Sequence, residues 1–360
     1  MSKLQESFKN TIIRIAGPWG RGTGFYLSDY KLIVTNLHIT GKAKQMVISG
    51  AYFPKTITRL LYSDPIHDLA FIAAPESVLL TGLILANTDS LIVGDKITTI
   101  GHSHGSNFNA RKNTVTKIQR SKTGQELIYI DAKTNNENFG GALVNENNEL
   151  VGINCFADDK NGGIALPVSY IKQALDEYSG IYGQFAFRCP SCSNIITEIN
   201  TEAYTCPKCG GLIPKEDVDG KRYMPSAIGE KIEEIIRKLN YEVEISRVGQ
   251  NLWEIEEGSA LIRIVHDVKN KYVIANTILC KLPHENNGSI YEYLLKENNY
   301  LKSLSFSIIQ QNIILSLSYI YENDLHVHTA TSLFKTLFDK ADDYDDILIE
   351  MGALPLFDED

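Results

Sequence analysis

The sequence predicts a multidomain protein in which an all-β half precedes a small cysteine-bearing segment and an α+β domain. Residues 8 to about 167 contain short apolar runs such as NTIIRIAG, KLIVTN and DLAFIAA, broken by Gly, Asn and Asp. Two C-x-x-C pairs follow, and from Ser226 amphipathic helical patterns alternate with strand-like runs. A chain of 360 residues has room for two or three such domains.

The first half is predicted to be all-β because its many short strands are separated by regular turn signals, which is typical of a barrel or sandwich. The segment SYIKQALDEYSG (169–180) has helical spacing and ends at a glycine. We therefore expect one helix to close this half.

The C-terminal segment has the order αββββαββα, which predicts an α+β layer fold. Its first helix, 226–240, carries isoleucines and Leu239 on one face. The remaining elements are expected as strands at 241–246, 251–256, 260–266 and 271–279, a helix at 289–299, a hairpin at 304–320 and a helix at 329–351.

The net charge of -9 and the pI near 5.5 disfavour nucleic acid and anionic membrane as partners, because neither attracts an acidic surface. The N-terminal stretch MSKLQESFKNTIIRIAG lacks the apolar core of a signal peptide, and no run is long enough to span a bilayer. We therefore expect a cytoplasmic protein with reduced cysteines, in which Cys155 and Cys280 are core residues.

Four motifs in residues 1–183 resemble those of HtrA-like trypsin-like serine proteases. RGTGFYLSDYKLIVTNLHIT aligns His38 with the general-base histidine of that family, and SDPIHDLAFIAA aligns Asp68 with the aspartate that orients it. IDAKTNNENFGGALVNENNELVGINC resembles the motif around the nucleophile, and GGIALPVSYI resembles the strand and helix that close the substrate cleft. The resemblance implies a trypsin-like double β-barrel.

The same resemblance implies that the chemistry is disabled. The mechanism needs a hydroxyl to attack, a histidine to take its proton, a carboxylate to orient the histidine, and backbone N–H groups to stabilise the oxyanion. Phe139 stands at the nucleophile position, and Glu137 replaces a glycine that shapes the oxyanion hole. His38 and Asp68 then become vestigial, and the sequence predicts a pseudoprotease kept for binding a protein or an extended peptide.

Three alternatives remain open for this half. His38 and Asp68 are either relics or a hydrogen-bonded pair retained for packing. An active endopeptidase would need another nucleophile, such as Thr134 or a serine of the 102–106 loop, HSHGS. The cleft could also hold a peptide by strand addition, which needs no nucleophile. The two histidines of that loop, His102 and His104, are interpreted as part of a polar turn rather than a metal site.

The cysteine segment, 184–216, has the spacing of a Cys₄ zinc ribbon. Two C-x-x-C pairs stand thirteen residues apart and supply four thiolates, which suit one structural Zn²⁺; iron is the main rival. So short a segment buries little apolar surface, so the metal would hold it together. The predicted ligands are Cys189, Cys192, Cys206 and Cys209.

Residues 224–346 resemble the type III secretion chaperone-like group that includes CesT and YbjN. The pattern consists of an amphipathic helix, the meander with WEIEEGSALIRIV, the helix YEYLLKENN, the hairpin FSIIQQNIILSLSYI and a long closing helix. The resemblance implies partner binding, with a homodimer through this domain as one form. Residues 217–223 are then a linker, and 347–360 an acidic tail.

Together these features predict a catalytically inactive scaffold or adaptor, by analogy in a bacterial defence or stress system. An active protease with a non-standard nucleophile is the first alternative. Nucleic-acid binding through the zinc ribbon is the second.

Overall fold

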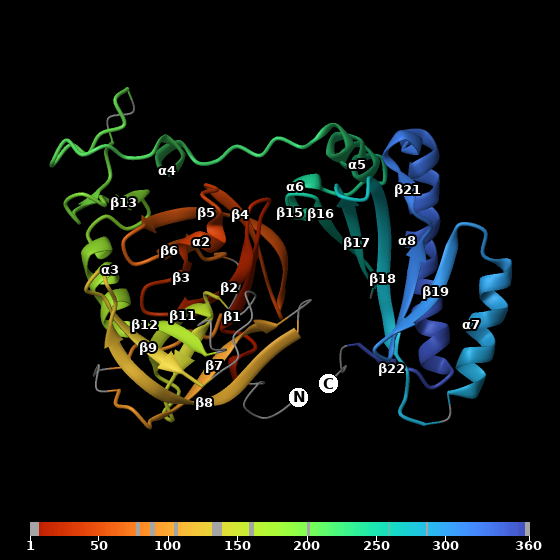
Figure 1. Ribbon diagram of the computed structural model, residues 1–360, viewed down its shortest axis with the longest axis horizontal. Helices are drawn as coiled ribbons and strands as arrows, with labels where there is room; N and C mark the ends of the chain where they lie inside the picture. The colour runs from red at the N-terminus through yellow and green to blue at the C-terminus, as the bar shows by residue number, and fades with distance from the viewer. Residues whose placement is uncertain are drawn as a thin grey trace. The chain divides into compact units, whose positions relative to one another are not determined.

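The computed structural model describes residues 7–76, 80–86, 91–103, 107–131, 139–157, 162–199, 202–258, 260–285 and 287–356. It divides into two compact units, Met1–Arg222 and Tyr223–Asp360 (Figure 1). The division falls at the end of the predicted linker. Among the residues that the structure describes, no helix has both the length and the apolarity to cross a membrane.

The first unit begins with a six-stranded antiparallel barrel. Its order is β5-β4-β1-β2-β3-β6, and pairing of β5 with β6 closes it. Successive side chains of a strand alternate between faces, so Ile13 and Ile15 fill the interior while Ile12 packs outside it. The strands are β1 (Ile12–Ala16), β2 (Arg21–Leu27), β3 (Leu32–Asn36), β4 (Gln45–Gly50), β5 (Phe53–Asp64) and β6 (Leu69–Ala73).

A second closed barrel follows, in the order β10-β11-β12-β9-β8-β7. Its interior is aliphatic, with Ile97, Val115, Ile128 and Leu143 fully buried. The two barrels confirm the predicted all-β double β-barrel. The strands are β7 (Lys96–Ser103), β8 (Asn107–Arg120), β9 (Glu126–Ile130), β10 (Ala142–Val144), β11 (Leu150–Ala157) and β12 (Gly163–Pro167).

The barrels share one hydrophobic cluster between them. Phe25 and Phe71 from the first barrel meet Ile100 and Ile153 from the second, and all four are fully buried. Helix α3 (Val168–Ser179) adds Ile171 to the same cluster, close to its predicted position at 169–180. This shared core fixes the elements that carry the candidate site.

The cysteine segment joins the first barrel. Strand β13 (Ala186–Arg188) pairs with β5 in parallel and with β14 (Ile195–Ile196) in antiparallel fashion. The pairing of Ala186 with Tyr62 and of Phe187 with Ser63 brings the residues just before the first cysteine alongside the end of β5.

The predicted linker is partly helical and packs against the first barrel. Helix α4 (Lys215–Asp219) lies in a stretch, 214–221, that we call the return segment. Lys44 Nζ donates to the carbonyl of Asp217 at 3.0 Å, and the Lys221 N–H donates to the Lys42 carbonyl at 2.9 Å.

The second unit is built on an antiparallel sheet of order β15-β16-β17-β18-β20-β19, with two short strands also pairing with β18. Helices α5, α7 and α8 bury their apolar faces on one side of this sheet. The elements are α5 (Ala227–Lys238), α6 (Val243–Ser246), β15 (Arg247–Gly249), β16 (Leu252–Glu257), β17 (Ala260–Asp267), β18 (Tyr272–Lys281), α7 (Gly288–Tyr300), β19 (Leu304–Ile309), β20 (Asn312–Leu317), β21 (Ile320–Tyr321), η3 (Glu322–Asp324), α8 (Val327–Glu350) and β22 (Leu354–Pro355).

The stretch 241–246 differs from its prediction as a strand, because Val243–Ser246 forms helix α6. Ser246 donates both its N–H and its hydroxyl to the Glu242 carbonyl, which closes a helical turn. Val243 is buried in the core of the unit. The likeness to type III secretion chaperones and the homodimer remain predictions.

Candidate functional site

His38 and Asp68 are brought together by the register of two neighbouring strands. Antiparallel β3 and β6 pair Asn36 with Leu69, so the residues just beyond Asn36 face those just before Leu69. His38 lies in the single helical turn α2 (Leu37–Thr40), and the Leu37 N–H donates to the Asp68 carbonyl at 3.0 Å. The two motifs therefore meet in space.

The Asp68 carboxylate holds the His38 side chain in one orientation. Its Oδ2 lies 2.6 Å from His38 Nδ1, and its Oδ1 accepts the His38 backbone N–H at 2.9 Å. Because an ionised carboxylate only accepts, the Nδ1 proton points toward Asp68. Nε2 is then the ring nitrogen that could take a proton, and the His38 side chain is 38% exposed. We call this pair the dyad.

Asn36 supports the aspartate from the buried side. Asp68 has a φ of 53°, a left-handed conformation that is uncommon for a residue with a side chain. The buried Asn36 donates Nδ2 to the Asp68 carbonyl at 3.1 Å and to Cys155 Sγ at 3.2 Å. Asn36 stands within the motif VTNLH, but the sequence predicted no role for it.

Phe139 packs against the histidine at the nucleophile position. Its ring centroid lies 5.7 Å from that of His38, at an interplanar angle of 80°. The Phe139 carbonyl accepts the Thr23 N–H at 2.9 Å, which ties this residue to the first barrel. The ring presents carbon and hydrogen to His38, neither of which can act as a nucleophile.

The backbone after Phe139 requires the glycine that the motif supplies. Gly140 has a φ of +79°, and a Cβ there would lie 2.1 Å from the Thr23 carbonyl oxygen. Its N–H donates to the Asn154 carbonyl at 2.9 Å. Glu137 and Thr134 lie outside the described residues.

A second aromatic ring, from Phe156, also lies against His38. The two rings are stacked with centroids 5.9 Å apart and an interplanar angle of 24°. Phe156 belongs to β11 and is 48% exposed, so it offers an apolar surface beside the dyad. It was not predicted from the sequence, although it directly follows the GINC motif.

Cys155 lies near the dyad, but its thiol is a poor candidate for a nucleophile. Burial, and secondarily the Asp68 carboxylate, raises the pKa of the Cys155 thiol to about 12. The thiolate, which is the reactive form, is therefore scarce at neutral pH. Its side chain is 2% exposed.

The 102–106 loop supplies little to the site among the residues described. Burial, with a smaller contribution from the Arg14 charge, lowers the pKa of His102 to about 4, so this histidine is neutral. Its N–H donates to Thr23 Oγ1 at 3.0 Å. His104 and Ser106 lie outside the described residues.

The four cysteines converge on one point at the edge of the first unit. Their sulfurs all lie within 4.8 Å of one another. Cys189 and Cys209 Sγ are 3.8 Å apart, and Cys192 and Cys206 Sγ are 3.9 Å apart. A tetrahedron with Zn–S bonds of about 2.3 Å has edges of about 3.8 Å, whereas a disulfide needs about 2.05 Å.

The two cysteine turns have matching backbones. Ser193 and Gly210, each four residues after the first cysteine of its pair, have φ values of 60° and 70°. Their N–H groups donate to the carbonyls of Cys189 and Cys206, both at 2.8 Å. The second cysteine of each pair also accepts a hydrogen bond, Cys192 from Asn194 and Cys209 from the Gly211 N–H. This donor set fits a tetrahedral thiolate site.

Residues 22–153 match the family described as "Trypsin-like peptidase domain". The periplasmic serine endoprotease DegP of Escherichia coli K12 is 31% identical over 173 residues, covering 45% of this chain and 36% of DegP. The periplasmic pH-dependent serine endoprotease DegQ of the same organism is 32% identical over 149 residues, covering 40% of this chain and 33% of DegQ. The matched part thus spans about a third of these relatives.

The solved structure of the HtrA-type protease AlgW with a decapeptide superposes with a TM-score of 0.44 and 21% identity, covering 52% of this chain and 70% of that one.

The cytoplasmic location predicted from the sequence is wrong by this comparison, since both relatives are named as periplasmic proteins. That prediction depended on one N-terminal segment, which is a weaker indicator of compartment than homology over 173 residues. The expectation of reduced cysteines was drawn from the cytoplasmic location, so it loses its support as well.

The described geometry and the comparisons agree on the first unit. Its two barrels, its His–Asp pair and the glycine after position 139 lie within or beside the matched range. Residues 22–153 therefore match a trypsin-like peptidase domain, and this part of the chain is similar in sequence to serine endoproteases such as DegP.

Proposed function

We propose that this protein is a pseudoprotease that binds a protein or an extended peptide without cutting it. The observation that carries the proposal is the phenyl ring of Phe139 against His38, at the position of the attacking hydroxyl. An oriented imidazole can activate a side-chain nucleophile as a general base only if that nucleophile is within hydrogen-bonding reach. Phe139 provides none.

The surface beside the dyad supports peptide binding. Phe156 is 48% exposed and His38 is 38% exposed in its side chain, so an aromatic surface remains open where Phe139 blocks chemistry. An extended peptide can add to an exposed sheet edge through backbone hydrogen bonds and place one side chain against such a surface. The binding role needs no restored catalytic group.

We further propose that Cys189, Cys192, Cys206 and Cys209 hold one structural zinc ion per chain. Sulfur spacings of 3.8 and 3.9 Å support a tetrahedral ion, and four protein ligands leave no open coordination position. The periplasmic relatives make an oxidising compartment relevant, so two disulfides are the competing state of these cysteines. Metal analysis with thiol counting distinguishes the two.

Binding without cleavage is tested with fluorescein-labelled casein as an unfolded protein probe. We expect its fluorescence anisotropy to rise with added protein while gel analysis shows no fragments over hours. Trypsin at the same concentration serves as the positive control for cleavage. Fragments produced by the purified chain would contradict the proposal.

Phe156→Ala tests whether the surface beside the dyad binds the probe. Burying part of a phenyl ring contributes roughly 1 kcal/mol, so the Kd for casein should rise about fivefold. Tyr52→Ala removes a ring that is 58% exposed in the turn between β4 and β5, and should leave the Kd unchanged. Equal effects of the two substitutions would place binding elsewhere.

A working protease with a different nucleophile is the second candidate. The intact dyad favours it, since a distance of 2.6 Å between Asp68 and His38 is the arrangement that a general base requires. This candidate needs a hydroxyl or thiol near His38 Nε2.

A further inference from the structure

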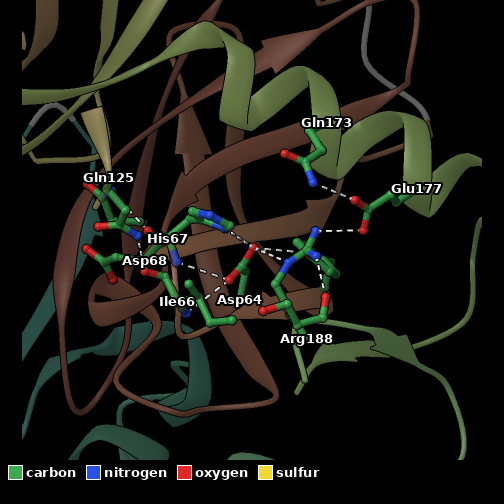
Figure 2. Close-up of polar contacts among 11 residues, drawn as sticks. Asp64, Ile66, His67, Asp68, Gln125, Gln173, Glu177 and Arg188 are labelled. Atoms are coloured by element: carbon green, nitrogen blue, oxygen red, sulfur yellow. Dashed lines mark hydrogen bonds and ion pairs between the residues drawn. The ribbon is translucent and has the colours of Figure 1, made fainter. Parts of the chain in front are cut away.

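A buried ionic cluster outside the dyad joins the four-cysteine site to the segment that carries Asp68. Arg188 directly precedes Cys189 and is 2% exposed. Its Nη1 donates to the Ser193 carbonyl at 2.7 Å, inside the first cysteine turn, and its Nε donates to Asp64 Oδ2 at 2.7 Å. Figure 2 shows Arg188 between Asp64 and Glu177, the latter paired with Nη2 at 2.9 Å.

The Asp64 carboxylate shapes the turn that leads to Asp68. Its Oδ1 accepts the N–H groups of Ile66 and His67 at 3.0 and 3.1 Å, and its Oδ2 lies 2.8 Å from His67 Nδ1. Asp64 is fully buried, and Figure 2 shows its contacts with Ile66, His67 and Arg188. One carboxylate thus fixes the backbone up to the residue before Asp68.

Charge and backbone pairing both favour a fixed turn. Burial would raise the pKa of Asp64, but the His67 hydrogen bonds and the Arg188 charge hold it below its usual value, so the carboxylate stays ionised. An ionised buried carboxylate needs its partners, and removing one leaves an uncompensated charge. The parallel pairing of β13 with β5 places Arg188 beside the strand that ends at Asp64.

The return segment reaches the other half of the dyad. After Cys209 the chain runs back so that Lys221 Nζ lies 3.7 Å from the Trp19 ring centroid. Gly41, at the end of the turn that carries His38, packs so closely that a Cβ would lie 2.2 Å from Trp19 Cβ. The cysteine segment thus contacts the surroundings of Asp68 through Arg188, and the return segment that follows it contacts those of His38 through Lys221.

We infer that Arg188 is a positioning residue through which the metal state of the four cysteines controls the geometry of the His38–Asp68 dyad. The inference relies on the zinc site proposed above. Cys189 bound to the ion fixes the turn that presents the Ser193 carbonyl, and this carbonyl holds Arg188 against Asp64. Loss of the ion loosens Ser193, then Asp64, then the backbone that presents Asp68.

Two measurements on the full chain follow the segment and the dyad: hydrogen exchange of a peptide covering residues 64–69, and the downfield proton resonance of His38 Nδ1–H. Arg188→Lys keeps the charge, but the single nitrogen of lysine cannot replace the separate Nε, Nη1 and Nη2 donors of Arg188. We expect exchange in 64–69 to rise at least about tenfold and the His38 resonance to broaden or vanish. Phenanthroline treatment of the wild type should raise the 64–69 exchange and broaden the His38 resonance in the same way. The same treatment of Arg188→Lys should change neither signal further.

Arg247→Lys is the matched control. Arg247 also pairs with a buried carboxylate, that of Glu233 in the second unit, to which its Nε and Nη2 donate at 2.6 and 2.7 Å. Arg247→Lys should leave the hydrogen exchange of residues 64–69 and the His38 resonance unchanged. If the chain contains zinc, but the 64–69 exchange and the His38 resonance are unchanged by both chelation and Arg188→Lys, this inference is wrong while the zinc proposal stands. A chain purified without zinc overturns the zinc proposal, and with it the metal dependence.

Discussion

At the scale of single residues, the proposed loss of catalysis depends chiefly on position 139. Asp68 and His38 keep the hydrogen bond that orients a general base, and Gly140 keeps its left-handed backbone. Phe139 places a phenyl ring where these two groups would act. The described site thus combines an oriented histidine with a residue at position 139 that has no hydroxyl to donate a proton.

Phe139→Ser should give activity close to background, because Glu137 remains where the oxyanion hole needs a glycine. Phe139→Ser combined with Glu137→Gly should be roughly a hundredfold more active than the single variant, the usual effect of one oxyanion donor. Hydrolysis of a fluorogenic peptide checks both. High activity of Phe139→Ser alone would show that the hole is already formed.

Asp64→Asn should destabilise the first unit by about 3 kcal/mol at pH 7, because it removes the buried carboxylate partner of Arg188 and leaves only the partly exposed Glu177. The lowered pKa of Asp64 stabilises the fold above pH 3.8, the ordinary pKa of an aspartate, and this contribution is lost as pH falls through the lower native value. The difference between variant and wild type should therefore shrink below about pH 4. Urea unfolding at several pH values measures it, and a pH-independent difference would argue against an ionised Asp64.

The sequence predicted the residues of this site unevenly. His38, Asp68 and Phe139 stand in motifs with fixed spacing, so their meeting followed from resemblance alone. Arg188 and Phe156 were missed because their roles depend on elements that are distant in sequence. Arg188 reaches Asp64 because β13 pairs with β5, and Phe156 of β11 stacks on His38 of α2. In the sequence, a single arginine before a cysteine does not indicate which distant residues it contacts.

At the scale of elements, many strands of the two barrels were predictable because short apolar runs are separated by Gly, Asn and Asp, as for β1, β3 and β6. The helix α6 and the return segment were not. Val243–Ser246 has β-branched residues typical of a strand, yet local hydrogen bonds to Glu242 close a turn there. The return segment is polar, and its contacts with Lys42, Lys44 and Trp19 distinguish it from a free linker.

Replacing Cys189 and Cys206 by Ser should lower the zinc content from one ion per chain to none, since each turn loses a thiolate. Elemental analysis of the purified variant measures this directly. Cys280→Ser, at a buried cysteine of the second unit, should keep the ion. A wild-type chain with two disulfides and no metal would contradict the prediction.

At the scale of the whole molecule, the chain forms two units with separate cores, and each unit contains one of the two tryptophans. Trp19 contacts the return segment through Lys221, and Trp253 is fully buried in the second unit. The two side chains can therefore report the stability of each unit in the intact protein.

In Trp253→Phe, the remaining Trp19 reports the first unit, and chelation should lower its unfolding midpoint. In Trp19→Phe, the remaining Trp253 reports the second unit, and chelation should leave its midpoint unchanged. The four cysteines belong to the first unit, where they lie in the chain between β13, which pairs with β5, and the return segment. Fluorescence-monitored urea unfolding with and without phenanthroline measures both midpoints. A shift of both by the same amount would show that the units unfold as one.

The most direct test of the central claim is labelling of the purified chain with a fluorophosphonate, which reacts with an activated serine. We predict no labelling of the wild type above that of His38→Ala. Labelling that requires His38 and disappears on substitution of a single serine or threonine would reveal a working nucleophile. That result would contradict the proposal that this protein binds a protein or peptide without cutting it.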